Sequence, residues 1–246
     1  MASALDISKV KKDFYAEVRQ MANDQFASPQ YQRLLAIPLT QKRAQVYVLQ
    51  KGFWNLNRRD TWAFAQALAP MDVKALIWEH ELDELQGNEA RGVEDHYSLQ
   101  VRQAATIGLT RADFENEVAR EETLMAIYSW VHLAKDSPWL KSLASCAALE
   151  VSNSSDWVDG GGMSYRWGKK QEADLGIPFN KQINAKEHAE VDVEHGNLLT
   201  KVVERHCDTS AKLDQAMEGL KESWMLDRAW KGILASYLEE LPGPSK

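Results

Sequence analysis

The sequence predicts an all-α protein. Apolar residues recur at spacings of three and four along almost the whole chain, whereas alternating runs of β-branched residues bounded by turn residues are scarce. Of the 246 residues, 44% are hydrophobic and 26% are charged, which is typical of a globular chain. No repeat, low-complexity tract or interdomain linker interrupts the pattern. We therefore expect residues 1–246 to form a single helical domain.

Four helices are expected in the N-terminal part, approximately over residues 6–23, 28–37, 40–68 and 71–106. Ser28-Pro29 is a helix-start signal, and Thr40 is a suitable N-cap for the third helix. The third helix is expected to break around residues 55–58. The fourth is expected to run on through Gly87 and Gly92.

Four more segments are expected to be helical, approximately over residues 110–134, 138–153, 184–207 and 209–241. Thr110 with Asp113 resembles a capping box, and Ser137-Pro138 is a strong start signal. Residues 152–170 are rich in Ser and Gly, and we interpret them as a mobile connection. Three basic residues in this connection are candidates to close over a substrate carboxylate: Arg166, Lys169 and Lys170.

The charge and the termini exclude several function classes. The net charge of −7 would repel a phosphate backbone, so we do not expect a nucleic-acid partner. No stretch approaches the roughly 18 apolar residues of a membrane span, and the N-terminus has no apolar signal region. We expect a cytoplasmic protein with no membrane partner. Cys146 and Cys207 form no CxxC pair, so neither zinc nor a disulfide framework is indicated.

Ionisable residues occupy positions that the helical period assigns to the core. In the predicted helix over 71–106, the inward stripe consists of Leu82, Leu85, Glu89, Val93, His96 and Leu99. Glu89 and His96 are seven residues apart, which places them about two turns apart on one face. Both are residue types that bind metals.

The helix over 184–207 repeats this anomaly. His188, Asp192 and His195 lie at offsets of four and seven residues, so the three side chains share one face. Glu150 lies on the apolar side of the helix over 138–153. Three helices would thus contribute three carboxylates and three imidazoles to the core.

Such a set is costly to bury unless its members neutralise one another or bind cations. Two divalent metals would satisfy it. Mixed carboxylate and imidazole ligands suit non-haem iron or manganese, whereas zinc has no thiolate here to favour it. The paired Glu-x-x-His motifs of ferritin-like sites are absent from the sequence.

The pattern Glu89-x6-His96, Glu150, His188-x3-Asp192-x2-His195 resembles the ligand set of the haem-oxygenase-like di-iron oxidases and oxygenases. These are relatives of TenA and PqqC and include the Chlamydia protein associating with death domains. The segment KALIWEHELDELQGNEARGVEDHYSLQ also resembles the long third core helix of that family. The resemblance implies a haem-oxygenase-like bundle of about seven core helices.

The resemblance further implies a centre of two Fe(II), with manganese an option at one site and O2 as co-substrate. Its activity would be oxidation of a small amine or amino-acid-derived molecule by N-oxygenation, desaturation or oxidative C–C cleavage. Glu89, His96, His188 and His195 would be ligands, and Glu150 and Asp192 would be carboxylates free to bridge or shift. The expected partners are the small-molecule substrate and, as further options, an external electron donor and a second copy in a homodimer.

Alternative interpretations remain open at this stage. His80, His132 and His206 are interpreted as ordinary hydrogen-bonded residues, and Asp60 as a surface residue rather than an additional carboxylate near the metals. A metal-free TenA-like hydrolase or cofactor-handling enzyme would use Cys146 or Cys207 as a nucleophile. A non-enzymatic helical interaction protein is the third alternative.

Overall fold

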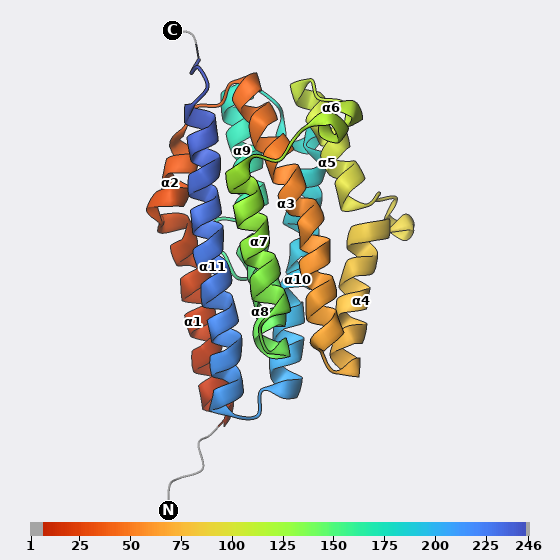
Figure 1. Ribbon diagram of the computed structural model, residues 1–246, viewed down its shortest axis with the longest axis vertical. Helices are drawn as coiled ribbons and strands as arrows, with labels where there is room; N and C mark the ends of the chain where they lie inside the picture. Colours follow the sequence, from red (N-terminus) through yellow and green to blue (C-terminus); the bar gives the residue numbers. More distant parts are fainter. Residues whose placement is uncertain (1–6, 245–246) are drawn as a thin grey trace, which may run out of the picture.

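A computed structural model describes residues 7–244, apart from the side chains of residue 90 and of residues 190–196 (Figure 1). Its described part is built from helices and contains no β-strand, which confirms the all-α prediction. The principal helices are α1 (Ile7–Ala27), α2 (Pro29–Ala36), α3 (Gln41–Leu68), α4 (Met71–Gln86), α5 (His96–Ala104), α6 (Arg111–Asn116), α7 (Glu121–Lys135), α8 (Trp139–Asn153), α9 (Met163–Leu175), α10 (Ile183–His206) and α11 (Ser210–Glu239). Three single 3-10 turns lie between them, η1 (Glu89–Arg91), η2 (Ala105–Ile107) and η3 (Phe179–Lys181).

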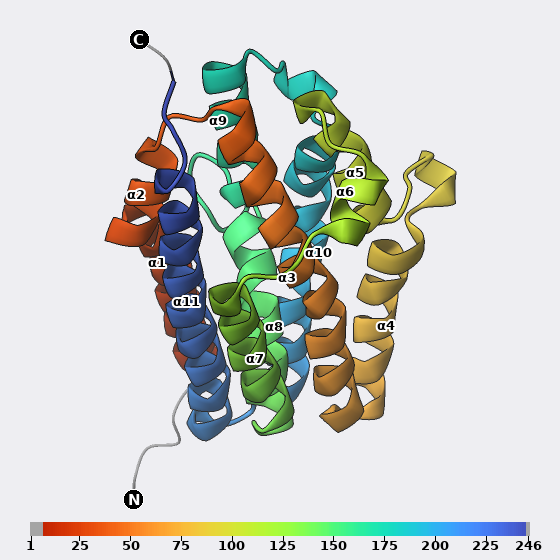
Figure 2. The same cartoon turned by 45° about the horizontal axis from the view of Figure 1, so that its top comes forward.

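Helix α8 forms the centre of the bundle. Every residue from 142 to 152 is buried, and most of them are small. The helix packs against α11, α10, α3 and α7, which enclose it in Figure 2. A charged side chain on a helix that is buried all round must lie inside the protein, where it needs a partner. Glu150, near the C-terminus of α8, therefore indicates an internal polar site.

The predicted continuous helix over 71–106 is wrong. Helix α4 ends at Gln86 because Gly87 adopts a positive φ of 73°, and a Cβ there would lie 2.4 Å from the Val93 carbonyl oxygen. Leu82 and Leu85, which the prediction assigned to the core, are exposed. The residues from Leu82 to Leu99 that were predicted to share one inward face, Glu89 among them, therefore do not lie on one helix.

A short hairpin replaces the middle of that helix. Asn88 and Val93 form an antiparallel bridge, with hydrogen bonds of 2.9 and 3.0 Å between their backbones. The turn η1 forms the tip of this hairpin, which projects from the edge of the bundle in Figures 1 and 2. Asp95 then caps α5 by accepting a hydrogen bond of 2.8 Å from the Ser98 amide. His96 is thus the first residue of a new helix.

Three other boundaries differ from the prediction. Helix α3 runs unbroken through residues 55–58, where Asn57 and Arg58 are buried among neighbouring helices. The segment over 110–134 is divided into α6 and α7. The buried amide of Gln50 satisfies the intervening backbone, donating to the Val118 carbonyl and accepting from the Arg120 amide.

The connection over 152–170 is also more ordered than predicted, because helix α9 begins within it at Met163. Met163, Trp167 and Gln171 lie four residues apart and are all buried on one face of this helix. None of the helices in the described part of the chain combines the length and the apolar character that a membrane span requires.

The closest helix approach gives a test of this packing. A Cβ at Gly219 of α11 would lie 2.2 Å from the Lys141 carbonyl oxygen of α8, so Gly219→Ala forces the two helices apart. We expect a loss of about 1–3 kcal/mol in the free energy of unfolding, measured by denaturant titration. The control is Gly232→Ala in the same helix, where the nearest atom is the flexible Gln30 Cγ at 3.3 Å. The control should be neutral or stabilising, and equal effects would show that the approach is not tight.

Candidate metal centre

Two groups of potential metal ligands share one residue. Glu84, His96 and His188 form the first group, and His80, Glu84 and Glu150 form the second. Within each group, the potential ligand atoms all lie within 4.8 Å of one another. Glu84 belongs to both groups, so one carboxylate is available to either of them.

The first group joins helices α4, α5 and α10. Glu84 Oε1 lies 2.9 Å from His96 Nδ1, and the rings of His96 and His188 have centroids 4.6 Å apart. His188 Nδ1 lies 2.9 Å from the Asn184 carbonyl oxygen, which accepts a hydrogen bond if Nδ1 carries the proton. That tautomer leaves Nε2 with its lone pair, the form in which a histidine binds metal.

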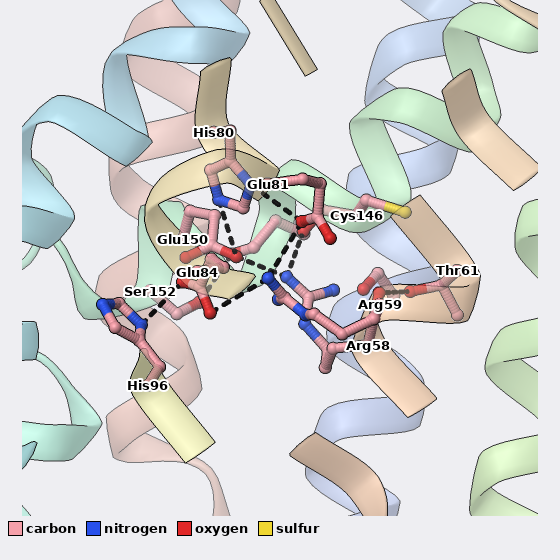
Figure 3. A network of polar contacts seen from close by, with 12 residues as sticks. Arg58, Arg59, Thr61, His80, Glu81, Glu84, His96, Cys146, Glu150 and Ser152 are labelled. Atoms are coloured by element: carbon pink, nitrogen blue, oxygen red, sulfur yellow. Dashed lines mark hydrogen bonds and ion pairs between the residues drawn. The ribbon is translucent and has the colours of Figure 1, made fainter. Parts of the chain in front are cut away.

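The second group joins α4 to the central helix α8. His80 Nε2 lies 3.7 Å from Glu150 Oε1, and His80 Nδ1 lies 3.0 Å from Glu81 Oε1 (Figure 3). A carboxylate on the far nitrogen of an imidazole is the usual support for a metal-binding histidine. The interpretation of His80 as an ordinary core histidine therefore missed a candidate ligand, because the sequence places it on α4 but does not show that α8 approaches it.

Two consecutive arginines of α3 neutralise these acids. Arg58 Nη2 lies 2.5 Å from Glu150 Oε1, and Arg59 Nη1 lies 2.9 Å from Glu81 Oε1 and 3.0 Å from Glu84 Oε2. Figure 3 shows the guanidinium groups and the three carboxylates converging from α3, α4 and α8. The Arg58–Glu150 pair is buried, and the pairs of Arg59 are partly buried, which makes their mutual attraction stronger than at the surface and their separation costly.

This arrangement keeps the carboxylates of Glu84 and Glu150 ionised. Burial opposes ionisation of Glu84, but the charges of Arg59 and His96 outweigh it and hold the pKa of that carboxyl well below its usual range. Burial opposes ionisation of Glu150 as well, and the hydrogen bond with His80 and the charge of Arg58 again lower its pKa. A deprotonated carboxylate is the form that binds a metal ion.

The residues therefore fit a pair of divalent cations. Oxygen and nitrogen ligands at mutual distances under 4.8 Å, buried and ionised, are the donor set of iron and manganese sites. Three carboxylates face two arginines in the cluster, which leaves negative charge for a cation to balance.

The structure brings together three of the six residues that the sequence analysis selected, namely His96, Glu150 and His188. It does not bring Glu89 to them. Glu89 is exposed on the turn η1, and Glu84, twelve residues before His96, takes the corresponding place. The hairpin allows this, because it folds the chain back and returns His96 to the end of α4.

Asp192 and His195 follow His188 in helix α10, one and two turns further on, and their side chains lie outside the described residues. Asp60 is exposed, as expected. The basic residues proposed to form a lid have local partners: Arg166 donates to the Gly161 and Asp159 carbonyls, and Lys169 and Lys170 pair with Glu172 and Asp174.

A cavity of about 150 Å³ adjoins the ligand groups. Glu84, His96, Glu150 and His188 form one side of it. Trp54 and Tyr31 contribute aromatic surface elsewhere in its wall, together with the buried ion pair of Asp227 and Lys231. A space of this size beside the metal ligands can hold a small organic molecule.

Comparison with known proteins supports this description. Residues 45–228 match the model of a protein family described as "Iron-containing redox enzyme". None of the curated proteins is similar enough in sequence to count as a relative.

Several solved structures share the fold. A domain of unknown function with a haem-oxygenase-like fold from Shewanella denitrificans has a TM-score of 0.68 at 14% identity, covering 97% of this chain and 94% of its own. A CADD-like protein of unknown function from Nostoc punctiforme has a TM-score of 0.70 at 16% identity, covering 91% and 97%. A TenA family transcription regulator from Silicibacter has a TM-score of 0.61 at 12% identity, covering 91% and 96%. At these identities the similarity establishes a haem-oxygenase-like fold.

The placement of Glu84 and Glu89 is open to a direct test. Glu84→Gln should weaken binding at both metal positions because both ligand groups contain this residue. Glu89→Gln removes an equivalent charge from the exposed hairpin and should leave binding unchanged. Anaerobic Fe(II) titration followed by iron analysis of the desalted protein measures both. If Glu89→Gln weakened iron binding and Glu84→Gln did not, Glu89 and His96, seven residues apart, would be the ligands instead.

Proposed function

Because this chain belongs to the family of iron-containing redox enzymes, we propose that it is a non-haem di-iron oxidase or oxygenase that uses O2 to oxidise a small amine or amino-acid-derived substrate. The observation that carries the proposal is the carboxylate of Glu84, which is common to two adjacent groups of carboxylate and imidazole ligands. A carboxylate common to two adjacent ligand groups is compatible with a pair of metals, because a carboxylate has two oxygens that can each bind a metal ion.

Side chains of α4, α5, α8 and α10 would bind the two irons. Glu84, His96 and His188 would hold one iron, and His80, Glu84 and Glu150 would hold the other, with Asp192 and His195 as further candidate ligands from α10. Two bound Fe(II) ions would supply the electrons for O2 activation, and an external donor would restore them between turnovers. Glu81 would orient His80, and the Asn184 carbonyl would orient His188.

The helical bundle would contribute position and exclusion of water. The cavity lies against the ligand groups, so a substrate held there would be adjacent to the place of oxidation. Oxidation in a largely buried space protects reactive species from bulk water and from surface side chains. N-oxygenation, desaturation and C–C cleavage would differ in how the substrate is oriented in this cavity.

The cysteine-dependent alternative has less support. Burial raises the pKa of Cys146 to about 11 despite the opposing charge of Arg58, and burial also raises the pKa of Cys207 to about 11. Both thiols are buried. A catalytic cysteine needs the opposite conditions, a lowered pKa and access to the substrate. The alternative of a non-enzymatic interaction protein leaves the buried ligand groups without a role.

The proposed function predicts the stoichiometry of iron and its reaction with O2. Anaerobic titration of the metal-free protein with Fe(II) should saturate near two irons per chain, and rapid mixing with O2 should give a transient visible absorption. His188→Ala should abolish this transient. His132→Ala, on a side chain that is 79% exposed, is the matched control and should behave like the unaltered protein. Absence of stoichiometric iron binding would refute the proposal.

The state of the thiols gives a separate prediction. Neither Cys146 nor Cys207 should react with a thiol-specific disulfide reagent at pH 8 in the native protein, because each thiol is buried and its pKa is raised to about 11. Both should react after unfolding in guanidinium chloride. Rapid reaction of one thiol in the folded protein would favour the cysteine-dependent alternative instead.

A further inference from the structure

The cavity beside the ligand groups contains hydrogen-bond donors in excess. Arg58 Nη1 and Trp54 Nε1 are both buried and have no hydrogen-bond partner within the described residues. Both residues line the cavity. No fully buried side-chain oxygen of the described lining residues is left unpaired in the same way. Buried donors normally have an acceptor, so these two donors call for an acceptor from a molecule bound in the cavity.

A second buried cation, Lys231, also lines the cavity. Lys231 is 4% exposed, and its ammonium donates to Asp227 Oδ1 at 2.7 Å. The other oxygen of Asp227 accepts a hydrogen bond from the Tyr31 hydroxyl, so this carboxylate is fully engaged. An ammonium group has three N–H donors, and within the described residues one of those on Lys231 has an acceptor.

The ring of Trp54 lies near both cations. The guanidinium carbon of Arg58 lies 5.6 Å from the centroid of the Trp54 ring, and Lys231 Nζ lies 5.7 Å from the same centroid. All three residues line the cavity, so a ligand group bound beside this ring has both cations in its surroundings. The flat aromatic surface would at the same time support an apolar body of the ligand.

From this arrangement we infer that the cavity binds its small-molecule ligand through a carboxylate, which Arg58 and Lys231 take up beside the Trp54 ring. A carboxylate accepts hydrogen bonds at both oxygens and donates none, and it matches the planar guanidinium. Arg58 and Lys231 each have a carboxylate partner already, Glu150 and Asp227, so the preference rests on their remaining donors. A cationic amine would add further donors and a positive charge beside these groups. A neutral amide would offer one acceptor oxygen, and its hydrogen bonds would be weaker than the charge-assisted bonds of a carboxylate.

The inference deepens the proposed function, because it names carboxylates as the substrate class. It rests on that function in one respect, which is that the bound carboxylate is the substrate of the oxidation. Arg58 Nη2 is already paired with Glu150, whereas Nη1 is the atom without a partner. A ligand carboxylate at Nη1 thus leaves the Arg58–Glu150 pair in place. Binding should for this reason occur in the metal-free protein, separately from any iron chemistry.

The test compares three probes of similar shape on the metal-free protein. An apolar cavity of about 150 Å³ accommodates benzene, so a fluorobenzene ring with one small polar group is a suitable probe. Fluorine NMR titrations with 4-fluorobenzoate, 4-fluorobenzamide and 4-fluorobenzylamine report binding without activity. We expect saturable binding of the benzoate, displaced by hexanoate, and at least about ten-fold weaker binding of the amide and the amine.

Variants locate the binding. Arg58→Met should weaken 4-fluorobenzoate binding at least about ten-fold, and Arg58→Lys should weaken it less. The double change Lys231→Met with Asp227→Asn removes both charges of the second pair, keeps the interior neutral and should also weaken binding. Arg19→Met, at a side chain that is 49% exposed, is the control and should have no effect. Circular dichroism of each variant verifies folding.

Equal binding of the amide or the amine, no saturable binding of either carboxylate, or benzoate binding that the Lys231 and Asp227 double variant does not change would overturn the inference. The double variant and the probe series remain decisive if Arg58→Met fails to fold. Iron titration of the same protein is measured separately. Two irons without any carboxylate preference would refute this inference alone, whereas carboxylate binding without iron would refute the proposed oxidase alone.

Discussion

The arrangement of α3, α4 and α8 depends on the pairing of three carboxylates with two arginines inside the helical bundle. Glu81, Glu84 and Glu150 meet between α4 and α8, where the removal of charge from water costs several kcal/mol per group unless it is compensated. Arg58 and Arg59 compensate it from two consecutive positions of α3. This requirement explains why α3 continues as one helix through residues at which the sequence suggested a break.

The central helix sets the geometry of this compensation. Most of its buried residues are alanines, serines and one cysteine, so α11 and α10 approach closely, and Glu150 is buried near its C-terminal end. Trp224 of α11 adds to this packing by donating to the Ala148 carbonyl and to the Ser152 hydroxyl. Close packing thus fixes the ligand positions, since a rigid scaffold is what a metal centre needs for defined coordination.

Sequence periodicity was sufficient for the fold class and for part of the site. His96, Glu150 and His188 stood out because metal-binding residue types occupied core positions, and the structure brings them together. Glu84 was missed because the pattern was extended through Gly87 as if the helix continued, which moved the expected ligand to Glu89. His80 was missed because it becomes a candidate ligand only where α8 packs against α4. Contacts between helices that are distant in sequence cannot be read from local periodicity.

Because of the hairpin between α4 and α5, the number of residues between Glu84 and His96 does not by itself set the relative orientation of the two side chains. In a continuous helix, insertion of one residue between two ligands rotates the second by about 100° and destroys the site. Here the paired backbones of Asn88 and Val93 close the base of the hairpin, and Gly87 and Asp95 fix its two ends. The turn at its tip lies beyond this paired base, and Arg91 in the turn pairs with Glu187 of α10 at 3.0 Å. A peptide inserted at residues 89–92 would therefore lengthen the turn without changing the paired base that sets Glu84 and His96 relative to each other, provided that the Arg91–Glu187 pair is kept.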